Sequence, residues 1–341
     1  MPTFDDLVGH DRVVAMLRGQ LARDRLAHAY WITGPEQVGK TTLARAVASA
    51  CLSADGWPGG LDAHPDFWAD DETGSCSVER IRGGEMGPLG PPLQHLLART
   101  PFAGGRRAVL IANCERLTDV AANSVLRLLE EPPAGTVLLL TTSRPQHEHL
   151  PPTVPSRCQP IALGPVPPEA IRAWLANRPE LDSRSIETAI ALADGRPGRA
   201  LGLALDPGAG AAAEIQVERL LVAAGQGPDG WLALAAELGA ELELARRATR
   251  SWAAFLRDAC RIAAGAPELV RWVRFQAQAE AWAAALGPAG CLARLGDCGE
   301  SLVRLGGNAT ARLTLDRLLL RLFDRAPVPP VLLPAGAAGG G

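Results

Sequence analysis

The sequence predicts an α/β protein in which a parallel, doubly wound sheet is followed by an all-helical part. In the first half, apolar runs of strand length alternate with segments of helical pattern, and a glycine-bracketed loop separates the first run from its helix. Such alternation is typical of parallel sheets covered by helices on both faces. Beyond residue 168 the strand-like runs stop, and Ala/Leu-rich helical patterns broken at Gly and Pro continue to about residue 323.

The loop is the most informative stretch, with the sequence GPEQVGKT over residues 34–41. Its spacing is that of a phosphate-binding loop (P-loop). Gly34 and Gly39 allow backbone amides to turn onto a phosphate chain, Lys40 reaches the terminal phosphates, and the Thr41 hydroxyl can hold Mg²⁺. The competing interpretation is a chance glycine turn before a helix, and the correct flanking elements disfavour it.

Lysine usage supports the same interpretation. The chain has 34 Lys plus Arg, and Lys40 is the only lysine among them. A compact ammonium on a flexible stem suits a phosphate loop better than a planar guanidinium does. We therefore expect ATP or ADP with Mg²⁺ to bind here.

Composition limits the remaining possibilities. The chain of 341 residues is 47% hydrophobic with a net charge of −3, which argues against a free-standing nucleic-acid binder with a broad basic face. No signal peptide or membrane span is expected, so a cytoplasmic location is predicted. The seven cysteines are scattered without a Cys-x-x-Cys pair, which favours reduced thiols in cores over a zinc site or a disulfide framework.

The elements follow from apolar runs and helix caps. Thr118 is expected to cap a helix through Glu131 that stops at Pro132 and Pro133. Residues 70–105 read as irregular, and residues 326–341 as a disordered tail. The expected strands and the first helices are, in order, a helix with Val13, Val14, Leu17 and Leu21 on one face, strand 29–32, a helix to about Leu52, a strand within 64–68, strand 108–112, strand 137–141 and strand 160–163.

An ATP-hydrolysing P-loop protein needs an acid at the end of a neighbouring strand, to hold Mg²⁺ through water and to activate the attacking water. The strand at 108–112 instead ends in Ala112 and Asn113. Glu115 follows beyond the expected strand end, where hydrogen-bond reach is disfavoured. The sequence thus predicts nucleotide binding without appreciable hydrolysis.

Several motifs resemble the bacterial clamp-loader subunits of the AAA+ class. They are Phe4–Gly9, His28–Tyr30, the GPEQVGKT loop, Leu129–Pro133 (LEEPP), Pro155–Cys158 with its Ser-Arg-Cys, and Asn308–Leu322. The resemblance runs from residue 4 to about 323 and is weak at 70–105. It implies an AAA+ nucleotide-binding domain at 1–164, a helical lid at 165–208 and a helical collar for oligomerisation at 209–325, with tau/gamma and delta subunits, a sliding clamp and primed DNA as partners.

Within this family the sequence favours the non-hydrolysing stator over the ATP-hydrolysing tau/gamma motor. The motor's Asp-Glu pair aligns with Ala112 and Asn113, and the family's sensor arginine falls at Gly198, with Arg199 one position along. The four-cysteine zinc knuckle of many members is absent between residues 52 and 64, so no zinc is expected. A P-loop kinase or switch is a weaker alternative, because it offers no use for LEEPP or Ser-Arg-Cys.

The resemblance also assigns a role to Arg157, the arginine of Ser-Arg-Cys. It implies an arginine finger that acts in trans on the γ-phosphate bound by a neighbouring subunit. Taken alone, an arginine in a Pro-flanked loop would read as a solvated charge, and Cys158 reads as a packing residue. The expected nucleotide contacts are Leu7, Val8, Gly34, Val38, Gly39, Lys40, Thr41 and Thr42.

Overall fold

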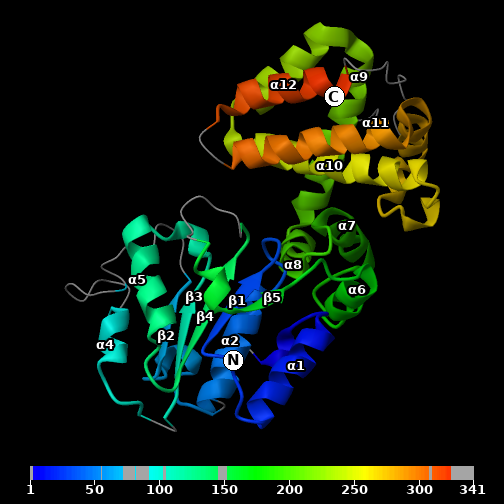
Figure 1. Ribbon diagram of the computed structural model, residues 1–341. Coiled ribbons are helices and arrows are strands. Elements are labelled where there is room, and N and C mark those ends of the chain that lie inside the picture. Colours follow the sequence, from blue (N-terminus) through cyan, green and yellow to red (C-terminus); the bar gives the residue numbers. More distant parts are fainter. Residues whose placement is uncertain are drawn as a thin grey trace. The chain divides into compact units, whose positions relative to one another are not determined.

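The computed structural model describes residues 3–54, 56–71, 81, 92–102, 105–144, 152–306 and 309–323. It divides into two compact units. The first comprises Met1–Trp174 and Gly195–Gly198, and the second comprises Leu175–Asp194 and Arg199–Gly341. The described strands all belong to the first unit, and the described part of the second is helical (Figure 1).

The first unit is built on a five-stranded sheet in the order β2-β3-β4-β1-β5, with every neighbouring pair parallel. The predicted parallel sheet is therefore confirmed, although the second strand begins at Phe67 and not at His64. Pro160 is tolerated because β5 lies at the sheet edge. The strands are β1 (Ala29–Thr33), β2 (Phe67–Asp70), β3 (Arg107–Ile111), β4 (Thr136–Thr142) and β5 (Gln159–Ala162).

Both faces of this sheet are buried, which explains why the strands read as continuous apolar runs. Side chains alternate between two cores: Tyr30 and Ile32 of β1 pack with α2, while Trp31 packs on the other face with α5. The same alternation recurs in β3 and β4. Figure 1 shows α5 on one side of the strands and α2 on the other.

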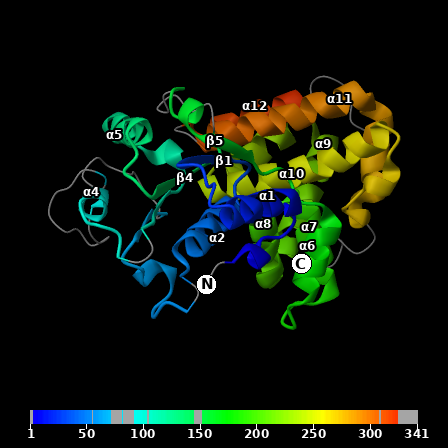
Figure 2. The ribbon, with the colours of Figure 1, turned by 60° about the horizontal axis from the view of Figure 1, so that its bottom comes forward.

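The helices of this unit begin and end where the sequence signals predict. The Thr118 hydroxyl accepts a hydrogen bond from the Ala121 amide, and α5 ends at Glu130, directly before Pro132 and Pro133. Figure 2 shows α1 alongside α2. The helices are α1 (Asp11–Ala22), α2 (Lys40–Leu52), α4 (Leu93–Leu97), α5 (Asp119–Glu130) and α6 (Pro168–Ala176), the last crossing into the second unit.

Part of the stretch predicted as irregular is helical. Leu93–Leu97 forms α4, with Leu93 fully buried. Most of the remaining residues between 72 and 91, and the predicted tail at 326–341, lie outside the described residues.

The helices of the second unit include two long ones interrupted by a Gly-Pro pair. Gly227 has φ 71° and ψ −170°, and Gly287 has φ 62° and ψ 177°, a conformation that only glycine adopts readily. Each precedes a proline that cannot continue the backbone ladder, so each helix kinks as the sequence predicts. The helices are α7 (Ser183–Ala193), α8 (Pro197–Leu205), α9 (Pro207–Leu238), α10 (Leu242–Ala263), α11 (Gln276–Leu305) and α12 (Ala311–Phe323).

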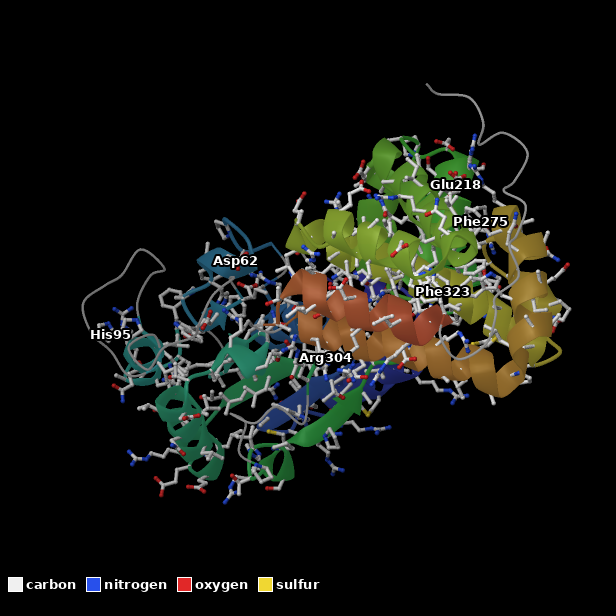
Figure 3. The ribbon with its side chains drawn as sticks, turned by 90° about the horizontal axis from the view of Figure 1, so that it is seen from above. Asp62, His95, Glu218, Phe275, Arg304 and Phe323 are labelled. Carbon is white, nitrogen blue, oxygen red and sulfur yellow. The ribbon has the colours of Figure 1, made fainter. Side chains whose placement is uncertain are left out.

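A single aromatic-rich core holds α9 to α12 together. The Trp252 indole is fully buried and donates to the Gln216 carbonyl oxygen at 2.7 Å. Trp282 packs edge-on against Phe255, with ring centroids 5.3 Å apart. At the surface, Arg274, next to Phe275, pairs with Glu218 of α9 at 2.7 Å, and Figure 3 shows Phe275 and Glu218 close together.

No helix in the described ranges is both long and apolar enough to cross a bilayer.

Candidate functional site: the phosphate-binding loop and the Ser-Arg-Cys turn

The GPEQVGKT loop connects β1 to α2 and depends on its two glycines. Gly34 has φ 152°, and a Cβ there would lie 2.4 Å from the Leu163 carbonyl oxygen. Gly39 has φ 113° and caps α2 without any side-chain hydrogen bond to the helix amides. Uncapped amides at a helix N-terminus provide the donors that an anion needs.

Lys40, the first residue of α2, turns its ammonium into this loop. Its Nζ donates to the carbonyl oxygens of Gly34 at 3.0 Å and Pro35 at 2.8 Å, and to the Ser143 hydroxyl at 2.8 Å. The side chain is only 5% exposed, and this burial lowers the pKa of Lys40, with Glu115 and Glu36 opposing the shift. A buried cation held by loop carbonyls fits a phosphate site.

The other predicted nucleotide contacts surround the loop. Leu7 is buried and would touch a Cβ on Gly39 at 2.9 Å, and Val38 is 1% exposed. Val8 is half-buried, and Thr41 and Thr42 lie half-buried in the first turn of α2. The structure thus places these residues on or beside one loop.

His10 belongs to the same surroundings, although sequence reasoning did not select it. Its ring hydrogen-bonds the Val38 backbone, and burial lowers its pKa. His10 also has φ 73°, directly after Gly9, where a Cβ would lie 2.8 Å from Val166. The only sequence signal was its place directly after the Phe4–Gly9 segment, which carries part of the resemblance.

The ends of β3 and β4 bring a carboxylate close to Lys40. Ser143 follows β4 directly, accepts from Lys40, and donates its amide to Glu115 Oε1 at 3.1 Å. Glu115 Oε2 is buried without a hydrogen-bond partner among the described residues. Sequence reasoning placed Glu115 too far beyond the strand, but a short 3-10 turn at Cys114–Arg116 folds it back. Ala112 and Asn113 offer no acid, as predicted.

The position of the family's sensor arginine is filled by close backbone packing. The Gly198 amide donates to the Gln37 carbonyl oxygen at 3.0 Å. A Cβ on Gly198 would lie 3.1 Å from the same oxygen, so a larger side chain would have to displace the loop. Gly198 therefore contributes a backbone contact to the loop where the family pattern has a charged side chain.

The second set of predicted residues lies away from Lys40, at the Ser-Arg-Cys turn before β5. Arg157 is 36% exposed; its Nη2 pairs with Glu130 Oε1 at 2.9 Å, and its Nη1 donates to the Thr153 carbonyl oxygen at 3.1 Å. Glu130 is the first glutamate of LEEPP and the last residue of α5. Two of the motifs that carry the resemblance, LEEPP and Ser-Arg-Cys, thus meet in one ion pair.

Cys158 anchors this turn from below. It is 9% exposed, packs in the core that contains Leu129 and Val154, and donates to the Val154 carbonyl oxygen at 3.3 Å. Burial raises the pKa of the Cys158 thiol to about 11. A packing role, as predicted, is consistent with this environment.

The sheet and loop together define an α/β protein of the P-loop class with a helical C-terminal part. Comparison with known proteins narrows this class. Residues 62–167 match the family model described as DNA polymerase III, delta subunit. The chain is 33% identical over 192 residues to DNA polymerase III subunit delta' of Pseudomonas aeruginosa, covering 51% of this chain and 55% of that protein.

A second relative is DNA polymerase III subunit gamma/tau of Mycobacterium tuberculosis, 28% identical over 193 residues and covering 55% of this chain and 33% of that protein. Among solved structures, a DNA polymerase III gamma subunit-related protein from Thermotoga maritima aligns with a TM-score of 0.46 and 17% identity, covering 91% of this chain and 99% of that one. The chain spans about half, or less, of the length of the curated relatives it matches. The chain is thus similar to subunits of DNA polymerase III, with delta' and gamma/tau among them.

Proposed function

We propose that this chain is the delta-prime subunit, the stator, of a cytoplasmic DNA polymerase III clamp loader. With tau/gamma and delta subunits it would help to open a sliding clamp and place it on primed DNA. In this proposal residues 1–164 form the nucleotide-binding domain, 165–208 the lid and 209–325 the collar that joins the subunits. The observation that carries it is the contact between LEEPP and Ser-Arg-Cys, through Glu130 and Arg157.

Arg157 would serve as an arginine finger for the nucleotide of a neighbouring subunit. Its exposed, permanently charged fork lies apart from the chain's own loop lysine and suits a phosphate whose oxygens gain charge during transfer. Fingers of this kind contribute about 10³ to 10⁵ in rate in related phosphoryl-transfer systems.

The test is reconstitution of a loader from this chain with tau/gamma and delta subunits of the same organism. We expect the chain to co-assemble with them and to be required for clamp loading onto primed DNA. Arg157→Ala should leave assembly intact and lower the ATPase rate that clamp and DNA stimulate. Failure of this chain to assemble with these subunits would contradict the proposal.

A second candidate, an ATP-hydrolysing motor of the tau/gamma kind, is favoured by one observation: close to Lys40, Glu115 has a buried oxygen with no hydrogen-bond partner in the described part of the chain. We nevertheless expect nucleotide binding with negligible turnover by the isolated chain, because Ala112 and Asn113 occupy the positions where acids would hold and activate water. Steady-state turnover that is lost in both Lys40→Ala and Glu115→Gln would favour the motor. Equilibrium dialysis with Mg²⁺ and ADP, using Lys40→Ala as the control, tests binding separately.

A further inference from the structure

The Ser-Arg-Cys turn is held by internal hydrogen bonds and by buried residues beneath it. Within it, the Arg157 amide donates to the Val154 carbonyl oxygen at 3.2 Å, and the Ser156 hydroxyl donates to that of Thr153 at 2.9 Å. Below it, Cys158 and Val154 are buried with Leu129 in the core under α5. The backbone that carries the Arg157 side chain is therefore fixed relative to the end of α5.

The guanidinium itself is held along one edge. Glu130 Oε1 lies 2.9 Å from Nη2, and the Thr153 carbonyl oxygen accepts from Nη1 at 3.1 Å. Both acceptors belong to the first unit, one on α5 and one in the turn. Because a guanidinium carries more N–H donors than these two contacts use, donors remain for an outside anion.

We infer that Glu130 is the positioning residue for Arg157, which is an inference that rests on the proposed trans role of this arginine. The pair is substantially exposed on both sides, at 36% and 49%, so it adds little to fold stability. The pair instead affects the orientation of the Arg157 guanidinium. A long arginine side chain loses rotamer freedom whenever it engages a phosphate, and a partner that already restricts it lowers that cost and aims the fork.

The chain offers a matched control in the next residue. Glu131 carries the same charge, is exposed, and follows Glu130 at the C-cap of α5. A general effect of removing negative charge from this surface would affect both glutamates equally. An effect through Arg157 is specific to Glu130.

The main experiment measures clamp- and DNA-stimulated ATPase of the reconstituted loader. Glu130→Gln is expected to lower kcat at the site that Arg157 serves by about 10-fold, with KM unchanged, because a misplacement of about 1 Å can cost up to about 100-fold in rate. Glu131→Gln should retain the wild-type rate. In an Arg157→Ala background Glu130→Gln should have no further effect.

A second measurement uses the isolated full-length chain and does not depend on the loader. In ¹⁵N NMR of arginine side chains, the Arg157 Nη signals should show restricted rotation in the wild type and in Glu131→Gln, and free rotation in Glu130→Gln. Equal thermal stability of the variants would show that the fold is retained.

The outcomes separate the two hypotheses. An unchanged rate with Glu130→Gln beside a lowered rate with Arg157→Ala overturns this inference and leaves the proposed function standing. An unchanged rate with Arg157→Ala removes the trans finger itself, whatever the NMR result. A raised rate with Glu130→Gln also overturns the inference, because Glu130 would then restrain Arg157 and not position it.

Discussion

The position of Lys40 requires a compact cation, which arginine does not provide. The ammonium is enclosed by two loop carbonyls and a serine hydroxyl, and Lys40 as a whole is 5% exposed. A planar guanidinium would need a wider, flatter set of acceptors. The shape of the space around the side chain, and not only the need for a positive charge, therefore explains why this position holds the chain's single lysine.

The lowered pKa of Lys40 gives a prediction for nucleotide binding as a function of pH. A bound phosphate favours the charged ammonium, so binding is undiminished below the pKa of the free protein and weakens as pH rises through it. Because burial lowers that pKa, the loss should begin at a lower pH than an ordinary lysine would give. Isothermal titration with MgADP over an alkaline pH series measures this.

The control for this series is Lys40→Arg, whose guanidinium stays charged throughout. Any binding that this variant retains should not vary with pH over the same range. If wild-type affinity is equally flat, the lysine does not carry the phosphate contact.

At the scale of elements, α12 has one buried and one exposed set of leucines. Leu315, Leu318 and Leu322 are fully buried in the core of the second unit, whereas Leu313 and Leu320 are 67% and 43% exposed. The apolar side chains of α12 thus lie mostly on an internal core face. The exposed leucines remain available for a partner subunit, as the collar proposal requires.

This division predicts that two matched substitutions differ strongly in their effect on the free energy of unfolding. Leu318→Ala should lower the free energy of unfolding by about 2–5 kcal/mol, because it leaves a cavity in a packed core. Leu313→Ala should change it by no more than about 0.5 kcal/mol. Urea denaturation followed by circular dichroism measures both.

The two exposed leucines of α12 test whether this helix contributes to subunit assembly. Leu313→Ser with Leu320→Ser should weaken co-assembly with the other loader subunits while leaving the unfolding free energy unchanged. If the double variant assembles normally, this face of α12 is not the interface.

The predictable elements are those whose signal is local. Continuous apolar runs gave β1, β3 and β4 within about a residue, and Thr118 with Pro132 bounded α5, because strand burial and helix capping are written in neighbouring residues. The meeting of Glu115, Ser143 and Lys40 was not predictable in this way. It depends on the strand order, which puts β4 beside β1 although a hundred residues of chain separate them, and on a short turn after β3.

The contact between Arg157 and Glu130 was missed for a related reason. Both residues were visible in family motifs, but a sequence gives no distance between the end of a helix and a turn some two dozen residues later. The buried anchors Leu129, Val154 and Cys158 bring them together, and each of these alone reads as an ordinary core residue.

At the scale of the whole molecule, the chain consists of two compact units with separate cores. The boundary at Trp174 and Leu175 lies inside α6, and Gly195–Gly198 returns to the first unit, where Gly198 contacts the phosphate-binding loop. The chain therefore passes between the two units within α6 and around Gly195–Gly198, over short stretches without a separate core. Separate cores favour separate unfolding, since two-state behaviour is a property of single cooperative domains.

This arrangement leads to a prediction about ligand effects on stability. MgADP contacts only residues of the first unit in our proposal, so it should raise the unfolding temperature of one calorimetric transition and leave the other in place. At a free concentration roughly 100 times Kd the stabilisation should be about 2.7 kcal/mol. Differential scanning calorimetry of the full chain, with and without MgADP, measures the shift.

Two variants assign the transitions to the units. Lys40→Ala should abolish the MgADP shift without moving the transition of the helical unit. Leu318→Ala should lower the unfolding temperature of the helical unit without moving the transition of the unit that contains the sheet. Each variant changes one core or site and leaves the other intact, so the assignment does not depend on knowing in advance which unit melts first. A single transition that MgADP and Leu318→Ala both move would show that the two units unfold together, and that nucleotide binding stabilises the helical unit as well.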